Sequence, residues 1–436
     1  MLKHLLLLLC LATPLLAYIQ TPSAYPNCTG SAGTQQILNI LPDEVDSVIN
    51  GKRYEISSPE NNTRLTIIAV QGTAYEMGFA YGQLMTKEIN DAMTGMFNYL
   101  VQQSDSWMGY VKQNLPFYLK WIPNLLSLDT PDLLTALLRL QYLFTKPYTP
   151  QRFSDELQGM ADGAQFDLNM LTNINLFPEF IRAQCSIVGA WGTATIDGNL
   201  VQLRALDWDY RTFIASWPVM AIYFPTEDGS NPFATFGFAG MVGAISGYST
   251  KVAVSQKVWM PVSTDPNSEF GEPFAYLLRD ILQFGNDLDS SMKIIQDTRR
   301  TCRIHVGVGS QKDKRMNGIM MSFNELSIFD DKNYTYYSDA HPQMDGIMYW
   351  DKKIQPSDNY CLGDILKQNL GKIDAEFLVK QAAPIHETGD TQLIAYDFAN
   401  QLVYIAYSDP TLAVKAYYRP LIKLDMKSLL NKSNHF

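Results

Sequence analysis

Hydrophobic residues recur with two different periods along this chain, and the change of period divides it into two parts. Between residues 90 and 176 they lie three and four positions apart, which is typical of helices with one buried face. From residue 185 onward, short apolar and β-branched runs between turn formers predict strands, interrupted by helices over residues 273–284 and 288–298. The pattern therefore predicts an α+β fold in which stacked sheets are covered by helices.

The helical part comes first in the chain. Helices are expected over residues 90–103, 108–128, 131–144, 149–164 and 168–176. Strands are expected over residues 65–70, 186–195, 200–206, 217–224, 233–238, 252–258, 304–308, 318–323, 334–338, 392–396 and 403–407. We expect residues 18–184 to form a mostly helical N-terminal portion, and residues 185–436 to form a strand-rich portion that packs with it as one unit.

A hairpin is predicted near the middle of the chain. Residues 186–195 read as one strand, Asp197-Gly198 is a strong turn signal, and residues 200–206 read as the returning strand. Antiparallel partners lie about 5 Å apart. The hairpin is therefore expected to bring Arg204 and Asp207 beside Cys185.

These three side chains suggest nucleophilic chemistry. A guanidinium lowers the pKa of a neighbouring thiol and makes it a better nucleophile. If the backbone were cut between Gln184 and Cys185, the new α-amino group could act as base to its own thiol, and Asp207 could orient it. The plainer interpretation is a buried structural cysteine and a surface ion pair between Arg204 and Asp207.

The segment from Cys185 to Asp209 resembles the nucleophile segment of N-terminal-nucleophile (Ntn) cysteine hydrolases. The closest resemblance is to the penicillin acyltransferase-like group, which includes acyl-coenzyme A:6-aminopenicillanate acyltransferase and the Dictyostelium dcd1 proteins. The stretch of residues 71–84, with Gly78 and Gly82 on one helix face, also resembles this group. The resemblance implies an αββα four-layer sandwich, with Cys185 as nucleophile, Arg204 holding the thiolate and Asp207 binding the freed amine.

The remaining site residues depart from the family pattern. The group completes its oxyanion hole with asparagines, and the matching positions here carry Ser249, or its neighbour Tyr248, and His305. Both Ser249 and His305 could donate a hydrogen bond to an oxyanion. His305 could instead be the base of a Cys–His dyad that needs no chain cleavage. A third alternative is a secreted binding protein that keeps the fold without the activity.

Composition and targeting signals indicate the cellular compartment of the protein and the partners it can bind. The chain has 436 residues, of which 46% are hydrophobic and 18% charged, and its net charge of −10 makes nucleic acid a poor partner. Residues 1–17 read as a signal peptide, and no later stretch predicts a membrane span. Glycosylation sequons begin at Asn27, Asn61, Asn333 and Asn431. We therefore expect a secreted or lysosomal protein. The family resemblance implies that it acts on a small acyl amide or acyl donor and that its processed chains stay associated.

Cysteines and histidines give weaker expectations. Cys28, Cys185, Cys302 and Cys361 remain after the signal peptide, and the expected disulfide is Cys302–Cys361, with no pairing as the alternative. No metal-ligand pair and no phosphate-binding loop occurs in the sequence, so neither a metal nor a cofactor is expected. Large apolar residues of the first helices could line an acyl pocket or form ordinary core. They are Met96, Phe97, Tyr99, Trp107, Tyr110, Phe117, Tyr118 and Trp121.

Overall fold

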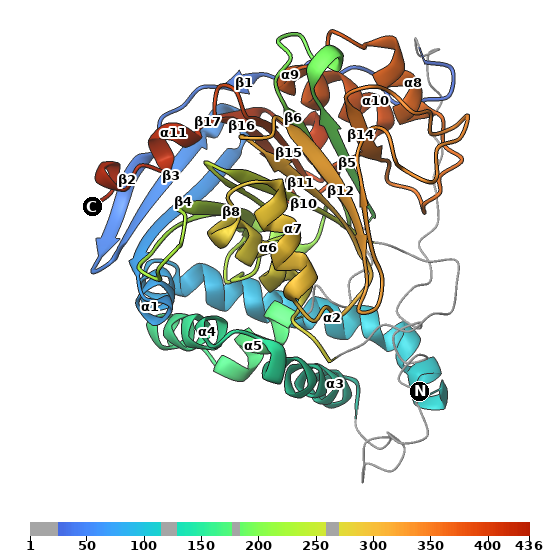
Figure 1. Ribbon diagram of the computed structural model, residues 1–436. Helices are drawn as coiled ribbons and strands as arrows, with labels where there is room; N and C mark the ends of the chain where they lie inside the picture. The colour runs from blue at the N-terminus through green and yellow to red at the C-terminus, as the bar shows by residue number, and fades with distance from the viewer. Residues whose placement is uncertain (1–24, 115–128, 177–183, 259–269) are drawn as a thin grey trace.

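Two sheets packed face to face form the centre of the molecule (Figure 1). A computed structural model describes residues 25–114, 129–176, 184–258 and 270–436. The first sheet has seven strands in the order β1, β17, β16, β15, β6, β5 and β14. In that order they span Ile37–Leu38, Leu421–Asp425, Leu402–Tyr407, Gln392–Asp397, Val201–Asp207, Gln184–Ala190 and Ile347–Trp350.

The second sheet has ten strands in the order β13, β12, β11, β10, β9, β8, β7, β4, β3 and β2. In that order they span Leu326–Phe329, Arg315–Met321, Ile304–Ser310, Val252–Val258, Ser246–Ser249, Phe233–Phe238, Pro218–Pro225, Thr63–Gly72, Gly51–Ser58 and Asp43–Val48. Strands β10, β11 and β12 lie against β5 of the first sheet. A Cβ atom on Gly307 of β11 would lie 2.8 Å from Ile187 Cγ2 of β5, so glycine lets the two sheets approach closely there.

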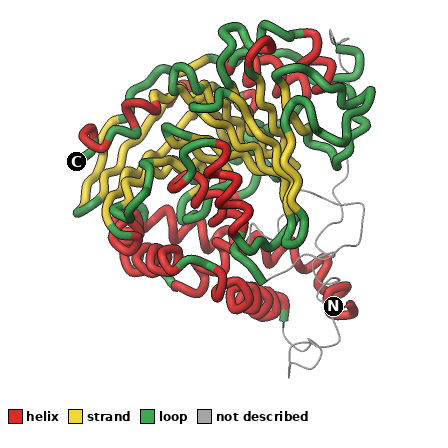
Figure 2. Tube along the Cα trace, in the orientation of Figure 1, coloured by secondary structure: helices red, strands yellow, loops and turns green. Residues whose placement is uncertain are grey.

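Helices cover both outer faces, as Figure 2 shows. Helices α1 (Ala74–Leu84), α6 (Phe274–Phe284) and α7 (Leu288–Asp297) pack on the ten-stranded sheet, and α9 (Ala375–Phe377) packs on the seven-stranded sheet. The other helices are α2, α3, α4, α5, α8, α10 and α11, which span Thr86–Asn114, Thr130–Thr145, Gln151–Ala164, Leu168–Leu176, Cys361–Gln368, Ala383–His386 and Met426–Leu429. These layers confirm the αββα sandwich.

Helices α1 and α4 touch through glycines on both sides. A Cβ atom on Gly78 would lie 2.1 Å from the Glu156 carbonyl oxygen, and one on Gly159 would lie 2.2 Å from the Tyr75 carbonyl oxygen. The close approach expected from the spacing of Gly78 and Gly82 is confirmed. It fixes α4, and with it Glu156, against the helix that follows β4.

The N-terminal portion contributes more strand than its apolar pattern predicts. Besides the expected β4, it supplies β1, β2 and β3. β4 lies between β3 and β7, and it pairs with β7 in parallel. Residues on both sides of the Gln184–Cys185 bond therefore share one continuous sheet.

Two expectations are corrected by the structure. Residues 334–338 form turns, because the Tyr334 ring packs edge-on against Phe329 and Trp350 and the segment is held by ring contacts. The disulfide joins Cys28 to Cys361, so the expected Cys302–Cys361 pairing is wrong. The sequence could not show this pairing, because the two half-cystines are 333 residues apart.

The signal peptide expected over residues 1–17 lies outside the described residues. Within the described part of the chain, no helix is long and apolar enough to cross a bilayer.

Candidate active site

The predicted hairpin forms, and it brings Cys185 and Arg204 together. β5 and β6 pair antiparallel, with Cys185 opposite Leu206, Ile187 opposite Arg204, and Gln184 opposite Asp207. The first strand is shorter than expected because a 3-10 turn over Gly192–Ala194 follows it. The Arg204 Nη2 atom lies 3.7 Å from Cys185 Sγ.

Arg204 is fully buried, and its charge has no carboxylate partner among the described residues. Its Nη1 donates to Gln392 Oε1 at 2.8 Å and its Nε to the Gln256 carbonyl at 3.3 Å. Burying an unpaired cation is costly. The side chain is therefore held ready for a negative charge, and the nearest group that can supply one is the Cys185 thiol.

The Cys185 thiol has competing influences on its pKa. Burial raises the pKa, and the positive charges of Arg204 and Lys257 and the backbone amide of Asp207 counteract part of that rise. Gln184, immediately before it, is exposed. The peptide bond between Gln184 and Cys185 thus runs from the surface of the protein to its interior.

The Asp207 carboxylate is held by a short loop after α10. It accepts hydrogen bonds from Thr388 Oγ1 at 2.5 Å, from the Gly389 amide at 2.8 Å and from the Asp390 amide at 3.4 Å. Burial raises the pKa of Asp207, while the Lys352 charge and these hydrogen bonds lower it. The carboxylate is therefore positioned next to Gln184 in the uncleaved chain, where a new amine on Cys185 would appear.

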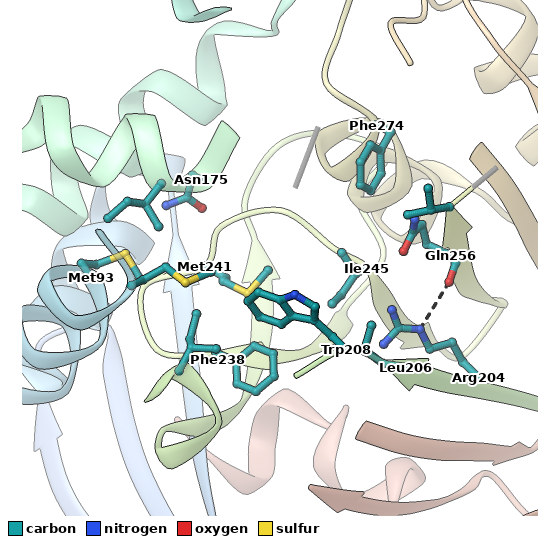
Figure 3. Close-up of a pocket in the computed structure, with 14 residues that line it drawn as sticks. Met93, Asn175, Arg204, Leu206, Trp208, Phe238, Met241, Ile245, Gln256 and Phe274 are labelled. Carbon is teal, nitrogen blue, oxygen red and sulfur yellow. Dashed lines mark hydrogen bonds between the residues drawn. The ribbon is translucent and has the colours of Figure 1, made fainter. Parts of the chain in front are cut away.

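A pocket that opens to solvent lies beside the thiol. Its lining is apolar apart from Asn175, Arg204 and Gln256 (Figure 3). The apolar lining residues are Met93, Met96, Ile174, Leu206, Trp208, Ile214, Phe238, Met241, Ile245, Val258 and Phe274. Figure 3 shows Arg204 at one end and Met93 at the other.

The thiol lies behind one wall of this pocket. Cys185 is 0% exposed and packs against Leu206, Trp208 and Ile245, all of which line the pocket. Arg204 connects the pocket with the thiol, because its side chain lines the pocket and also contacts Cys185 Sγ. Among the predicted pocket residues Met96 lines it, whereas the side chains of Trp107, Tyr110, Phe117, Tyr118 and Trp121 are outside the described set.

The two predicted oxyanion donors are placed differently. The Ser249 hydroxyl accepts from the Val252 amide at 3.0 Å and stabilises the turn from β9 into β10, so the structure does not bring it to the thiol. Its neighbour Tyr248 stacks on Tyr396.

His305 lies on β11, fully buried, with its ring 4.7 Å from that of Trp350. Burial, and then the charge of Lys257, holds the pKa of His305 well below its usual value. This environment disfavours the proton uptake that a Cys–His dyad requires.

Sequence reasoning missed Lys257, Gln392 and the loop of residues 388–390. Lys257 belongs to a correctly predicted strand, but nothing in its apolar neighbours signals that it faces Cys185. Among the described residues, no group of three or more histidine, cysteine, aspartate or glutamate side chains could hold a metal ion.

Asp390 gives the site a pH dependence that stability measurements can test. Burial and the Asp207 charge raise the pKa of Asp390 to about 7, and its Oδ1 accepts from the Trp208 amide at 2.8 Å. Between the ordinary pKa of 3.8 and 7, the folded chain holds a proton that the unfolded chain has lost. Stability therefore falls as pH rises through this window.

Asn at position 390 carries no charge and can still accept from Trp208, so Asp390→Asn is expected to flatten the pH profile. Thermal unfolding of uncleaved Cys185→Ala, with and without Asp390→Asn, measures this from pH 4 to pH 8. The double variant should be relatively more stable at pH 8, by a few kcal/mol at most since one pKa unit corresponds to about 1.4 kcal/mol. Exposed Asp358→Asn is the control, and parallel profiles for Asp390→Asn and its parent contradict the assignment.

The fold and the hairpin define the class of protein first: an αββα sandwich with a cysteine near the start of β5, the strand next to one edge of the seven-stranded sheet. No family model matches the chain. It is 33% identical over 436 residues to protein dcd1A of Dictyostelium discoideum, covering 95% of this chain and 96% of that protein. It is also 30% identical over 420 residues to dcd1B of the same organism, covering 91% and 80% respectively. The chain belongs to the dcd1 family.

Among solved structures, the Caenorhabditis elegans N-acylethanolamine-hydrolyzing acid amidase ortholog matches with a TM-score of 0.38 and 13% identity, over 50% of this chain and 96% of that one. A similarity of this size carries no argument about activity, and the fold assignment rests on the layers and strand order described above.

Proposed function

We propose that the chain is an N-terminal-nucleophile amidohydrolase or acyltransferase that cuts itself before Cys185 and then takes acyl groups from linear amides. The observation that carries the proposal is the buried Arg204 guanidinium, which contacts Cys185 Sγ and has no carboxylate partner in the described chain. A purely structural buried arginine is expected to pair with a carboxylate, as Arg279 pairs with Glu156 in this same protein.

The self-cleavage proceeds through a thioester. Cys185 Sγ bonds to the carbonyl carbon of Gln184, the peptide C–N bond breaks, and the thiol proton ends on the Cys185 nitrogen. Water then adds to the thioester carbon, the C–S bond breaks, and the sulfur takes a proton. Gln184 leaves with a new carboxylate and Cys185 gains a free amine, which Asp207 holds because its carboxylate is already fixed beside Gln184.

The acyl transfer repeats this chemistry on an external amide. The Cys185 amine takes the thiol proton, the thiolate adds to the amide carbon, and the C–N bond breaks as the leaving nitrogen receives that proton. Water or a second amine then resolves the thioester. The apolar pocket next to Arg204 fits a linear acyl chain, because its polar groups are confined to three side chains.

We also propose that the protein is secreted or lysosomal. The signal peptide predicted over residues 1–17 supports this proposal. The four sequon asparagines support it as well, because Asn27, Asn333 and Asn431 are exposed and Asn61 is half-buried.

Intact mass and N-terminal sequencing of the purified protein test the proposal. The expected result is a fragment that begins at Cys185, together with acylation of that fragment by a lauroyl thioester. A single intact chain with amidase activity indicates the Cys–His mechanism. A single chain that accepts no acyl group indicates a binding protein.

The disulfide predicts how the fragments behave. Cys28 lies upstream of the cut and Cys361 downstream, so the bond between them joins the two products. We expect one band on a non-reducing denaturing gel and two bands after reduction. Cys28→Ser should give two bands under both conditions, and two bands from the unreduced wild-type protein contradict the linkage.

A further inference from the structure

Lys257 is a lysine buried between the two sheets, at the level of the nucleophile. Side chains alternate along a strand, so Lys257 faces the same way as Ser255, whose hydroxyl accepts from Gln202 on the opposite sheet at 2.8 Å. Cys185 likewise shares the face of Ile187, which lies under Gly307. Ser255 pairs with Gly307, so Ser255 and Ile187 lie at the same level of the space between the sheets. Lys257 lies two residues beyond Ser255 on β10, and Cys185 lies two residues from Ile187 on β5. Lys257 and Cys185 are therefore placed at the same end of this space.

The ammonium group of Lys257 forms no salt bridge within the described chain, although the charges of Asp351 and Asp207 act on it. Lys257 is 3% exposed, and its Nζ donates to the Lys353 carbonyl at 3.1 Å. No carboxylate of the described chain lies within 4.0 Å of it. An ammonium has three N–H donors, and a buried charge without a counter-ion is costly. The ordinary burial of a lysine with a carboxylate does not explain this arrangement.

The charge of Lys257 acts on Cys185 from the facing sheet. Arg204 belongs to the same sheet as the thiol and contacts the sulfur, whereas Lys257 comes from the facing sheet. Burial lowers the pKa of Lys257, and negative charge on Cys185, Asp351 and Asp207 counteracts part of that fall. Burial raises the pKa of Cys185, and the charge of Lys257 counteracts part of that rise. Two buried basic side chains therefore act on the nucleophile, and one of them, Arg204, already contacts the sulfur.

We propose that Lys257 is the oxyanion donor of the active site, an inference that rests on the proposed function. When the thiolate adds to an amide carbon, the C=O π electrons move to oxygen, and Lys257 Nζ–H donates to that oxygen. As the intermediate collapses, the electrons return to the C–O bond, the C–N bond breaks, and the Cys185 ammonium protonates the leaving nitrogen. Lys257 thus performs the role that sequence analysis assigned to Ser249, whose hydroxyl is engaged in a turn.

The test compares Lys257→Met, which has no donor, with Lys257→Gln, which keeps one. Turnover of N-lauroyl aminomethylcoumarin by processed protein gives kcat and KM, and the pH profile of thiol alkylation reports the pKa of the thiol. Loss of an oxyanion donor costs about 10²–10³ in kcat. We expect this loss in Lys257→Met with little change in KM, about tenfold recovery in Lys257→Gln, and an alkylation profile that moves by less than about one pKa unit in either.

The matched control is Lys251→Met, an exposed lysine in the turn before the same strand. If Lys257→Met does not fold, Lys257→Gln alone decides, since it should still lose at least about tenfold in kcat. Wild-type turnover in both variants overturns the inference, and so does a kcat loss matched by an equal shift of the alkylation profile. If the wild-type protein itself is neither cleaved nor acylated, the proposed function fails instead.

Discussion

Purified Cys185→Ala is expected to be one intact chain that takes no acyl group from a lauroyl thioester, whereas the wild-type protein is cut and acylated. Both steps need the same sulfur, because it attacks Gln184 in the first and the amide substrate in the second. Intact mass before and after incubation with the thioester measures both steps. The fold should survive, since the change removes one heavy atom and Arg204 keeps its hydrogen bonds to Gln392 and the Gln256 carbonyl.

Cys302→Ser is the matched control, because Cys302 is the other cysteine of the described chain outside the Cys28–Cys361 disulfide. It should be cut and acylated like the wild-type protein. Acylation that persists in Cys185→Ala and disappears in Cys302→Ser would identify Cys302 as the nucleophile and would contradict the proposed function.

Substitution of the two buried arginines Arg204 and Arg279 by methionine is expected to have opposite effects on thiol reactivity and on stability. Arg204→Met should slow self-cleavage and thiol alkylation by about 10²-fold at neutral pH, because an adjacent cation shifts a pKa by about 1–3 units. Its unfolding temperature should change little, because the residue has no carboxylate to leave unpaired and Gln392 Oε1 still accepts from Ser246.

Arg279→Met should behave in the reverse manner. Arg279 holds Glu156 through two hydrogen bonds of 2.8 and 2.5 Å, with both side chains buried. Its loss leaves a buried carboxylate unpaired, which costs about 3–5 kcal/mol. Thermal unfolding and iodoacetamide kinetics, both in a Cys302→Ser background, separate the two effects. A large loss of stability with unchanged thiol reactivity in Arg204→Met contradicts its role at the nucleophile.

The core of the site could be predicted because it is local in sequence. Asp197-Gly198 sets the turn, strand alternation sets the faces, and the register then determines that Arg204 lies near Cys185 and Asp207 beside Gln184. The same logic predicted α5 and β8 at their observed bounds. Elements with a clear apolar period and with partners nearby in the chain can be predicted from the sequence alone.

The remainder depends on contacts between distant segments. Cys28 bonds to Cys361, and Asp207 accepts from Thr388. The charge of Lys257 acts on Cys185 only because two separate sheets stack. The apolar period of one segment does not identify the residues that pack against it from another layer of the fold. Ser249 was assigned to the site by resemblance alone, and its hydroxyl instead satisfies backbone amides at the start of β10.

The position of β4 bears on the timing of maturation. This strand belongs to the upstream piece with β2 and β3, yet it pairs with β7, and the strands β7 to β13 of the same sheet are made later. Neither Lys257 on β10 nor Gln392 on β15 exists in a nascent chain that has only reached the cleavage point. Under the proposed mechanism the cut therefore marks the end of assembly: the sulfur is inert until the last strands arrive, and the upstream piece then stays as a permanent subunit.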